Sequence, residues 1–208
     1  SIAKPSSNGS DKTYQELNDM QDMFKDRNEV IEKSVKDHDL EVGYAVKQYL
    51  KNNKFDYKES DVNKIADIGG GIVRYYKNKF ERVRPYQLAE ALKMKFDHMP
   101  LDSDSMKSPA YPSGHSLQSR LIAEYYAEQY PEHKKGLIAA AEETGKGRIY
   151  AGWHYPSDHE SAVKLAKQIY PNITMRKTFK ESIIDIPRRT YAPKVFDDAD
   201  TKDPKIKA

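Results

Sequence analysis

The chain of 208 residues is long enough for one domain with a sizeable core, and 35 Lys and Arg against 32 Asp and Glu leave a net charge of only +3. This near balance gives no support to a nucleic-acid partner. The sequence has no cysteine, which excludes disulfides and thiolate catalysis, and no apolar run approaches the roughly 18 residues of a membrane helix, so we expect no membrane span.

The first residues are mostly small and polar. Residues 1–12 are dominated by Ser, Asn, Gly, Asp and Lys, a composition typical of a flexible segment. They contain no apolar run of the signal-peptide kind. A cytoplasmic location is therefore the default expectation, with a removed leader left open.

Apolar residues recur at helical spacing from residue 13 onward, and we predict a helical domain over residues 13–170. Helical stretches are expected over residues 13–36, 40–51 and 61–80. The third of these contains three consecutive glycines, 69–71, each of which costs a helix about 1 kcal/mol relative to alanine. Either that helix bends at the glycines or a neighbouring element packs closely against their bare backbone.

Prolines and a serine organise the middle of the chain. Pro85 is placed to open a short helix, because proline is tolerated at the first helical position. Residues 97–112 contain three prolines and are expected to form a loop. Ser113 is predicted to cap a helix that runs to about Tyr126.

Two further helices are predicted, over residues 133–150 and from a cap at Ser157 to Ile169. Prolines scattered among Lys and Asp then predict a partly ordered C-terminal extension over residues 171–208. The sequence shows no set of strands and no internal repeat. The predicted fold class is all-α, a single-domain helical bundle.

Three short motifs carry residues suited to phosphate chemistry. In the first, Lys77 is followed after six residues by Arg84-Pro85. A separation of seven returns to nearly the same face of a helix, so both cations are expected to reach one anion. Taken alone, the pair also fits two solvated surface cations.

The second motif is Tyr111-Pro112-Ser113-Gly114-His115. If Ser113 caps a helix, the amides that follow it lie at the positive helix terminus, where a phosphate binds well. His115 in the first turn is placed to give a proton to a leaving oxygen. An ordinary capped helix with an incidental histidine is the alternative.

The third motif runs from Arg148 through His154 to Asp158. The Arg148 guanidinium offers a fork suited to phosphate oxygens. His154 and Asp158 fit a nucleophile and its orienting carboxylate, in which one ring N–H is held and the other nitrogen is free to attack. The alternative is a surface histidine beside a polar helix cap.

Together the three motifs resemble the type 2 phosphatidic acid phosphatase superfamily, and in particular its soluble branch, which includes bacterial non-specific acid phosphatases. The superfamily is related to the vanadium haloperoxidases. Its pattern is Lys-x6-Arg-Pro, then Pro-Ser-Gly-His, then Ser-Arg-x5-His-x3-Asp, and the resemblance spans about residues 60–165. It implies the helical bundle of the acid phosphatase/vanadium haloperoxidase type. Gly147 departs from the pattern, because the family usually has Ser there, and a hydroxyl contact near the site is lost.

By this resemblance the enzyme is a metal-independent phosphatase that needs no cofactor and acts on small-molecule phosphate monoesters, with diphosphates as a further substrate class. His154 is implied to be the nucleophile that forms a phosphohistidine, Asp158 to orient it, and His115 to be the acid on the leaving group. Five residues are implied to bind the phosphoryl oxygens: Lys77, Arg84, Ser113, Gly114 and Arg148. Homo-oligomerisation is left open.

Two other functions compete with this interpretation. A vanadate-dependent haloperoxidase would use the same pocket, because vanadate resembles a phosphoryl transition state, but haloperoxidases of this superfamily are generally much longer chains. A non-catalytic phosphate-ligand binding protein needs only cations and amides. The presence of His115, His154 and Asp158 argues against it.

Overall fold

Residues 1–100 and 103–173 are described by the computed structural model, and they contain eight α-helices and no strand. The all-α prediction is therefore confirmed. The predicted C-terminal extension, residues 171–208, lies outside the described residues except for its first three. The α-helices are α1 (Asp11–Met23), α2 (Glu29–Leu40), α3 (Tyr44–Asn52), α4 (Glu59–Phe80), α5 (Pro85–Ala91), α6 (Gly114–Gln129), α7 (Lys134–Tyr150) and α8 (Pro156–Ile169). The described residues also form four 3₁₀ turns, three between helices and the last directly after α8: η1 (Phe24–Asp26), η2 (Asp104–Lys107), η3 (Pro131–His133) and η4 (Tyr170–Asn172).

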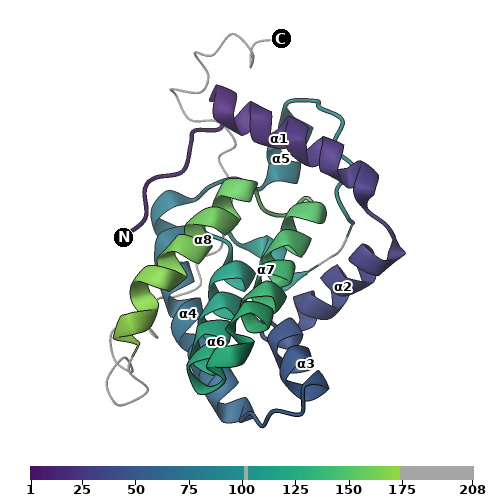
Figure 1. Cartoon of the computed structure of the whole chain (residues 1–208). Helices are drawn as coiled ribbons and strands as arrows, with labels where there is room; N and C mark the ends of the chain where they lie inside the picture. The colour runs from purple at the N-terminus through teal and green to yellow at the C-terminus, as the bar shows by residue number, and fades with distance from the viewer. Residues whose placement is uncertain (101–102, 174–208) are drawn as a thin grey trace.

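Helices α6 and α7 form the centre of the bundle (Figure 1). Helix α6 packs against α4, α7 and α8, whereas α2 and α3 pack against α7. Helix α1 lies across one end of the bundle, over α5 and the end of α7 (Figure 1). The main core lies between α4, α6, α7 and α8 and contains fully buried apolar side chains such as Leu117, Leu121 and Ala162. Helices that bury one face are expected to carry such a stripe of apolar residues.

The N-terminal boundaries differ from the sequence prediction. Helix α1 already begins at Asp11, because the Ser10 side chain accepts a hydrogen bond from the backbone N–H of Thr13. The expected single stretch over residues 13–36 is two helices, since Asn28 adopts extended backbone and caps α2. Part of the segment expected to be flexible rests on the fold, where the Tyr111 hydroxyl donates to the carbonyl of Ala3 at 2.7 Å.

The three glycines do not interrupt the third predicted helix. Helix α4 runs unbroken from Glu59 to Phe80. A Cβ on Gly69 would lie 2.9 Å from Cγ of Gln118 and 3.2 Å from Cδ2 of Leu117, both on α6. Close approach of α6 to bare backbone is therefore the reason for glycine at position 69.

The prediction that Lys77 and Arg84 share one helix face is wrong. Helix α4 ends at Phe80, and Glu81 takes the left-handed conformation with φ of 47°. Arg84 instead precedes α5, with Pro85 at the first helical position as expected. The two cations still converge, but through the turn that carries Ser108.

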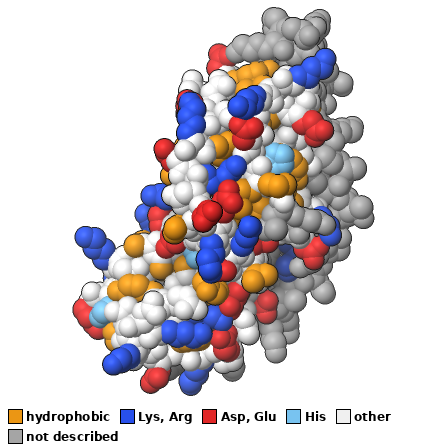
Figure 2. All heavy atoms as spheres, turned by 90° about the vertical axis from the view of Figure 1, so that its right-hand side faces the viewer, with side chains coloured by type: hydrophobic (Ala, Val, Ile, Leu, Met, Phe, Trp, Pro, Cys, Tyr) orange, Lys and Arg blue, Asp and Glu red, His pale blue; other side chains and the backbone are white. Residues whose placement is uncertain are grey.

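One face of the molecule carries charged side chains of both signs (Figure 2). On the face shown in Figure 2, Lys and Arg side chains alternate with Asp and Glu, and apolar patches lie between them. Within residues 1–100 and 103–173, no helix is both long and apolar enough to cross a membrane.

Candidate active site

The predicted site residues lie at one end of the bundle, where four helix termini meet. Lys77 is in the last turn of α4, Ser113 caps the start of α6, and Arg148 is in the last turn of α7. His154 lies in the connection from α7 to α8, and Asp158 is in the first turn of α8. The Ser113 N–H donates to the carbonyl of Asp158 at 3.1 Å, which fixes the start of α6 against that of α8.

His154 is held with one ring nitrogen facing an acid and the other facing a cation. Nδ1 lies 3.3 Å from Oδ2 of Asp158, and Nε2 lies 3.0 Å from Nη1 of Arg84. A guanidinium can only donate, so Nε2 is the acceptor and the single ring proton sits on Nδ1. Burial, together with the charges of Arg84 and Lys77, lowers the pKa of His154 well below its usual value. The imidazole is therefore neutral, with its lone pair on Nε2.

Asp158 is fully buried, and its carboxylate oxygens act as hydrogen-bond acceptors. Besides His154, it accepts from Nη1 of Arg82 at 2.7 Å and from the backbone N–H of Tyr155 at 2.8 Å. Burial raises the pKa of Asp158 to about 6, and the Arg82 charge offsets part of that rise. Arg82 stacks over the Tyr155 ring at 3.8 Å and also pairs with Glu16 of α1 at 3.1 Å.

Three buried cations surround His154. The side chains of Arg84 and Arg148 are almost fully buried, and so is Lys77. Burial and the charge of Arg84 lower the pKa of Lys77 well below its usual value. Such a concentration of like charge away from water is costly unless an anion compensates it.

The turn over residues 103–108 holds these cations from outside the bundle. Lys77 Nζ donates to the Ser108 hydroxyl at 2.8 Å, and Arg84 Nε donates to the Ser108 carbonyl at 2.9 Å. Arg148 donates through Nη2 to the Ser105 hydroxyl at 2.7 Å and through Nη1 to Asp39 Oδ1 at 2.6 Å. Asp39, at the end of α2, thus supplies one carboxylate to a site with three cations.

His115 faces the same charges. Its Nε2 lies 4.0 Å from Oδ1 of Asp39. Burial and the charge of Arg148 lower the pKa of His115 well below its usual value. In the anion-free site this ring is neutral, and a bound dianion would restore its affinity for a proton.

The start of α6 has the expected form. The Ser113 hydroxyl accepts from the backbone N–H of Ser116 at 3.4 Å and from the Ser116 hydroxyl at 2.9 Å. Gly114 follows as the first helical residue. The first amides of α6 therefore lie at a capped helix N-terminus, the kind of position at which anions bind.

The prediction that Ser157 caps α8 is wrong. Tyr155 is the N-cap and Pro156 the first helical residue, so Ser157 is inside the helix. The Ser157 hydroxyl donates instead to Glu16 Oε2 at 2.9 Å. Proline at the first helical position was the signal for this start.

Sequence reasoning missed the residues that support the site from other elements. Asp39, Arg82 and Glu16 belong to no motif, and nothing in their local sequence distinguishes them from solvated charges. Gly147 lies in α7 with its bare Cα facing α2, where an added Cβ would be 3.3 Å from Val35 Cγ2. A serine at position 147 would therefore place its Cβ against Val35 of α2.

Comparison with known proteins covers the part of the chain that carries the site. The family model of the PAP2 superfamily matches residues 65–166. The chain is 25% identical over 161 residues to a non-specific acid phosphatase of Providencia stuartii, covering 73% of this chain and 63% of that protein. It is 26% identical over 114 residues to a non-specific acid phosphatase of Salmonella typhimurium, covering 53% of this chain and 43% of that protein.

The chain therefore spans less than two thirds of the length of these curated relatives. Among solved structures, a transmembrane PAP2 type phosphatidylglycerolphosphate phosphatase from Bacillus subtilis matches with a TM-score of 0.47 and 18% identity. The match covers 81% of this chain and 90% of that chain. All eight predicted site residues fall inside the segment matched by the family model.

Proposed function

The chain belongs to the PAP2 superfamily, and from that premise we propose that it is a phosphatase that hydrolyses phosphate monoesters, and diphosphates as a further class, through a phosphohistidine at His154. The observation that carries the proposal is the environment of His154 Nε2. Its lone pair is kept unprotonated among Lys77, Arg84 and Arg148. A nucleophile among buried cations suits an anionic electrophile such as a phosphoryl group.

In the first step, His154 Nε2 attacks phosphorus, so that a P–N bond forms as the P–O bond to the leaving group breaks. Lys77, Arg84 and Arg148 turn from their present partners to the phosphoryl oxygens and stabilise the charge of the transition state. The amides at the start of α6 and the Ser113 hydroxyl bind the remaining oxygen. Asp158 stays ionised and holds Nδ1–H as positive charge develops on the ring.

His115 supplies the proton that the leaving oxygen needs. The substrate dianion reverses the charge around Nε2 of His115 and favours its protonated form. In the second step, water attacks phosphorus and His115 takes a proton from it, while the P–N bond breaks. His154 is then regenerated and inorganic phosphate leaves.

This scheme asks for no metal, because the three cations neutralise the phosphoryl oxygens. We expect p-nitrophenyl phosphate to be hydrolysed equally well with and without EDTA, and vanadate to inhibit. The release of inorganic phosphate is the measurement. Loss of turnover on chelation, with recovery on adding zinc or magnesium, would show that a two-metal mechanism operates instead.

A further inference from the structure

A chain of hydrogen bonds leads from Ser113 in the proposed phosphate site, through α6 and α8, to a carboxylate of α7. The Ser116 hydroxyl donates to the Ser113 hydroxyl at 2.9 Å, and His159 Nδ1 lies 2.9 Å from the Ser116 hydroxyl. His159 Nε2 lies 2.8 Å from Glu142 Oε1. We refer to these four residues, from α6, α7 and α8, as the relay.

The relay is held in place by close packing. A Cβ on Gly145 would lie 2.3 Å from His159 Nδ1 and 2.8 Å from the Ser116 hydroxyl. The imidazole therefore lies directly on the bare backbone of α7. Because His159 cannot move toward α7, its two ring nitrogens stay aimed at Ser116 and at Glu142.

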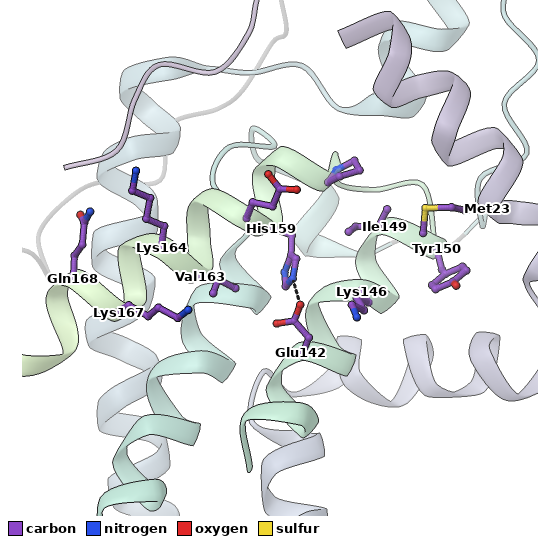
Figure 3. Close-up of a pocket in the computed structure, with 12 residues that line it drawn as sticks. Met23, Glu142, Lys146, Ile149, Tyr150, His159, Val163, Lys164, Lys167 and Gln168 are labelled. Carbon is purple, nitrogen blue, oxygen red and sulfur yellow. Dashed lines mark hydrogen bonds and ion pairs between the residues drawn. The ribbon is translucent and has the colours of Figure 1, made fainter. Parts of the chain in front are cut away.

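The outer end of the relay reaches solvent. His159 and Glu142 point toward each other in a cavity of about 780 Å³ between α7 and α8 (Figure 3). The His159 side chain is 8% exposed and that of Glu142 is 33% exposed. Protons can therefore exchange with water at the Glu142 end, although Ser113 itself is fully buried.

Counting protons along the relay fixes the direction of each bond. A serine hydroxyl has one proton, so a Ser116 that donates to Ser113 must accept from His159 Nδ1. The Glu142 carboxylate accepts from Nε2. In the state in which both ring nitrogens of His159 carry a proton, the ring pairs with Glu142 and the proton of Ser113 is left to point at a phosphoryl oxygen.

Loss of one proton from His159 reverses the relay. Nε2 keeps its proton, because a bare Nε2 would face a carboxylate lone pair at 2.8 Å. Nδ1 becomes an acceptor, Ser116 donates to it, and Ser113 donates to Ser116. Ser113 then presents only lone pairs to an anion.

We propose that His159 and Glu142 are positioning residues that set the direction of the Ser113 hydroxyl, and that protonation of this pair outside the site raises the site's affinity for phosphate. This proposal rests on the assignment of Ser113 to a phosphoryl oxygen in the proposed function. In this way, protonation of residues that do not react with the substrate changes the affinity of the site for phosphate.

Other charges face the same cavity. Lys146 from α7 and Glu160, Lys164 and Lys167 from α8 line it, whereas α1 contributes only Met23 and α6 reaches His159 through the uncharged Ser116. Of these charged groups, Glu142 lies within hydrogen-bond distance of the His159 ring, at 2.8 Å from Nε2.

To test this proposal, the dissociation constant of inorganic phosphate is measured by calorimetry between about pH 5 and pH 8, the range in which histidine side chains change charge. The variants are Ser116→Ala, which removes the inward acceptor of Ser113, and Glu142→Gln, which removes the charge that favours the imidazolium. Glu143→Gln is the matched control, since Glu143 is adjacent but bonds to Ser34 on α2. Ratios to wild type cancel the titration of phosphate and of His115 and His154.

We expect Ser116→Ala to match wild type at acid pH and to bind phosphate about tenfold more tightly at the alkaline end, the worth of one hydrogen bond to a charged group. In Glu142→Gln, phosphate binding should begin to weaken at a lower pH than in the wild type. Glu143→Gln should follow the wild-type pH curve. The ¹⁵N shifts of His159 should change over the same pH range.

Identical pH curves for wild type, Ser116→Ala and Glu142→Gln would overturn the relay. If the pH curves are identical and the wild type still hydrolyses phosphate esters, the relay proposal is wrong and the proposed function stands. If phosphate binds with the expected pattern but no ester is hydrolysed, only the proposed function is wrong. Glu142→Gln keeps the test decisive if Ser116→Ala fails to fold, because Glu142 is partly exposed.

Discussion

Asp158 has three partners that can only donate to it, and this limits what can replace it. They are Arg82, the N–H of Tyr155 and, in the neutral tautomer, Nδ1–H of His154. An amide in place of the carboxylate must turn its NH₂ toward one side. The charged Arg82 competes best for the remaining oxygen, so the NH₂ would face His154.

Asp158→Asn should therefore favour the tautomer with the proton on Nε2 and block the attack. We expect kcat to fall by about 10⁴ with the fold intact, an effect of the size seen when a catalytic histidine loses its orienting acid. Wild-type kcat/KM should also decline below about pH 6, where Asp158 becomes protonated, and this acid limb should be absent in the variant. The exposed Asp22→Asn is the control. Near-normal rates in Asp158→Asn would reduce Asp158 to a helix-capping residue.

The two histidines of the site should respond differently to the leaving group. His154→Ala removes the nucleophile and should be inactive on every ester. His115→Ala withdraws only leaving-group protonation, a factor of about 10²–10⁴ for a poor leaving group. Activity of His115→Ala on p-nitrophenyl phosphate should therefore stay far closer to wild type than its activity on an alkyl phosphate. Equal losses on both esters in both variants would contradict these roles.

At the scale of elements, the contact between α4 and α6 depends on one of the three glycines more than on its neighbour. A Cβ on Gly69 meets Gln118 Cγ at 2.9 Å and two leucines at 3.2 Å, whereas a Cβ on Gly70 meets only flexible side-chain ends at 3.3 and 3.5 Å. Gly69→Ala should lower the free energy of unfolding by about 1–3 kcal/mol through overpacking. Gly70→Ala should be neutral or stabilise by up to about 1 kcal/mol. Urea unfolding of both variants measures this, and equal effects would refute the close approach.

The elements also show what local sequence can and cannot predict. The cap at Ser113 and the helix start at Pro85 were predicted because their signals lie within four residues of the boundary. The split of the predicted 13–36 stretch was missed, because its apolar spacing continues through the break before Asn28. The left-handed Glu81 that ends α4 has no glycine to announce it.

The site divides along the same line. Residues of the three motifs were predicted, since each motif keeps its members within a few residues of one another. Asp39, Arg82 and Ser108 were missed, because they reach the site through tertiary packing of α2, the α4–α5 connection and the 103–108 turn. The relay residue His159 directly follows Asp158, yet only the packing of α7 and α8 reveals its partner.

For the whole molecule, the site's buried cations oppose folding when no anion is bound. Lys77 is 7% exposed and has a lowered pKa caused by burial and by Arg84. Lys77→Met should leave the anion-free protein equally stable or more stable, because replacing a buried charge by an apolar group removes its desolvation cost.

Phosphate should stabilise the wild type and not this variant. At one hundred times its dissociation constant, a ligand adds about 2.7 kcal/mol, which raises the Tm of a domain of this size by roughly 5–10 °C. Calorimetric melting with and without inorganic phosphate measures the shift. Lys79→Met, on the exposed face of α4, is the control and should keep it. A full phosphate shift in Lys77→Met would remove Lys77 from the anion site.

In the proposed mechanism, His154 carries the phosphoryl group during turnover. Acid-labile phosphate should be trapped by quenching turnover in alkali, followed by tryptic digestion and mass spectrometry. Trypsin separates the two candidates, because His115 lies in the peptide from Ser108 to Arg120 and His154 in that from Ile149 to Lys164. The second peptide also contains His159, so fragmentation must place the group. We expect phosphohistidine at His154 and none in His154→Ala. Phosphate found at His115, or on neither peptide during active turnover, would contradict this assignment of the nucleophile.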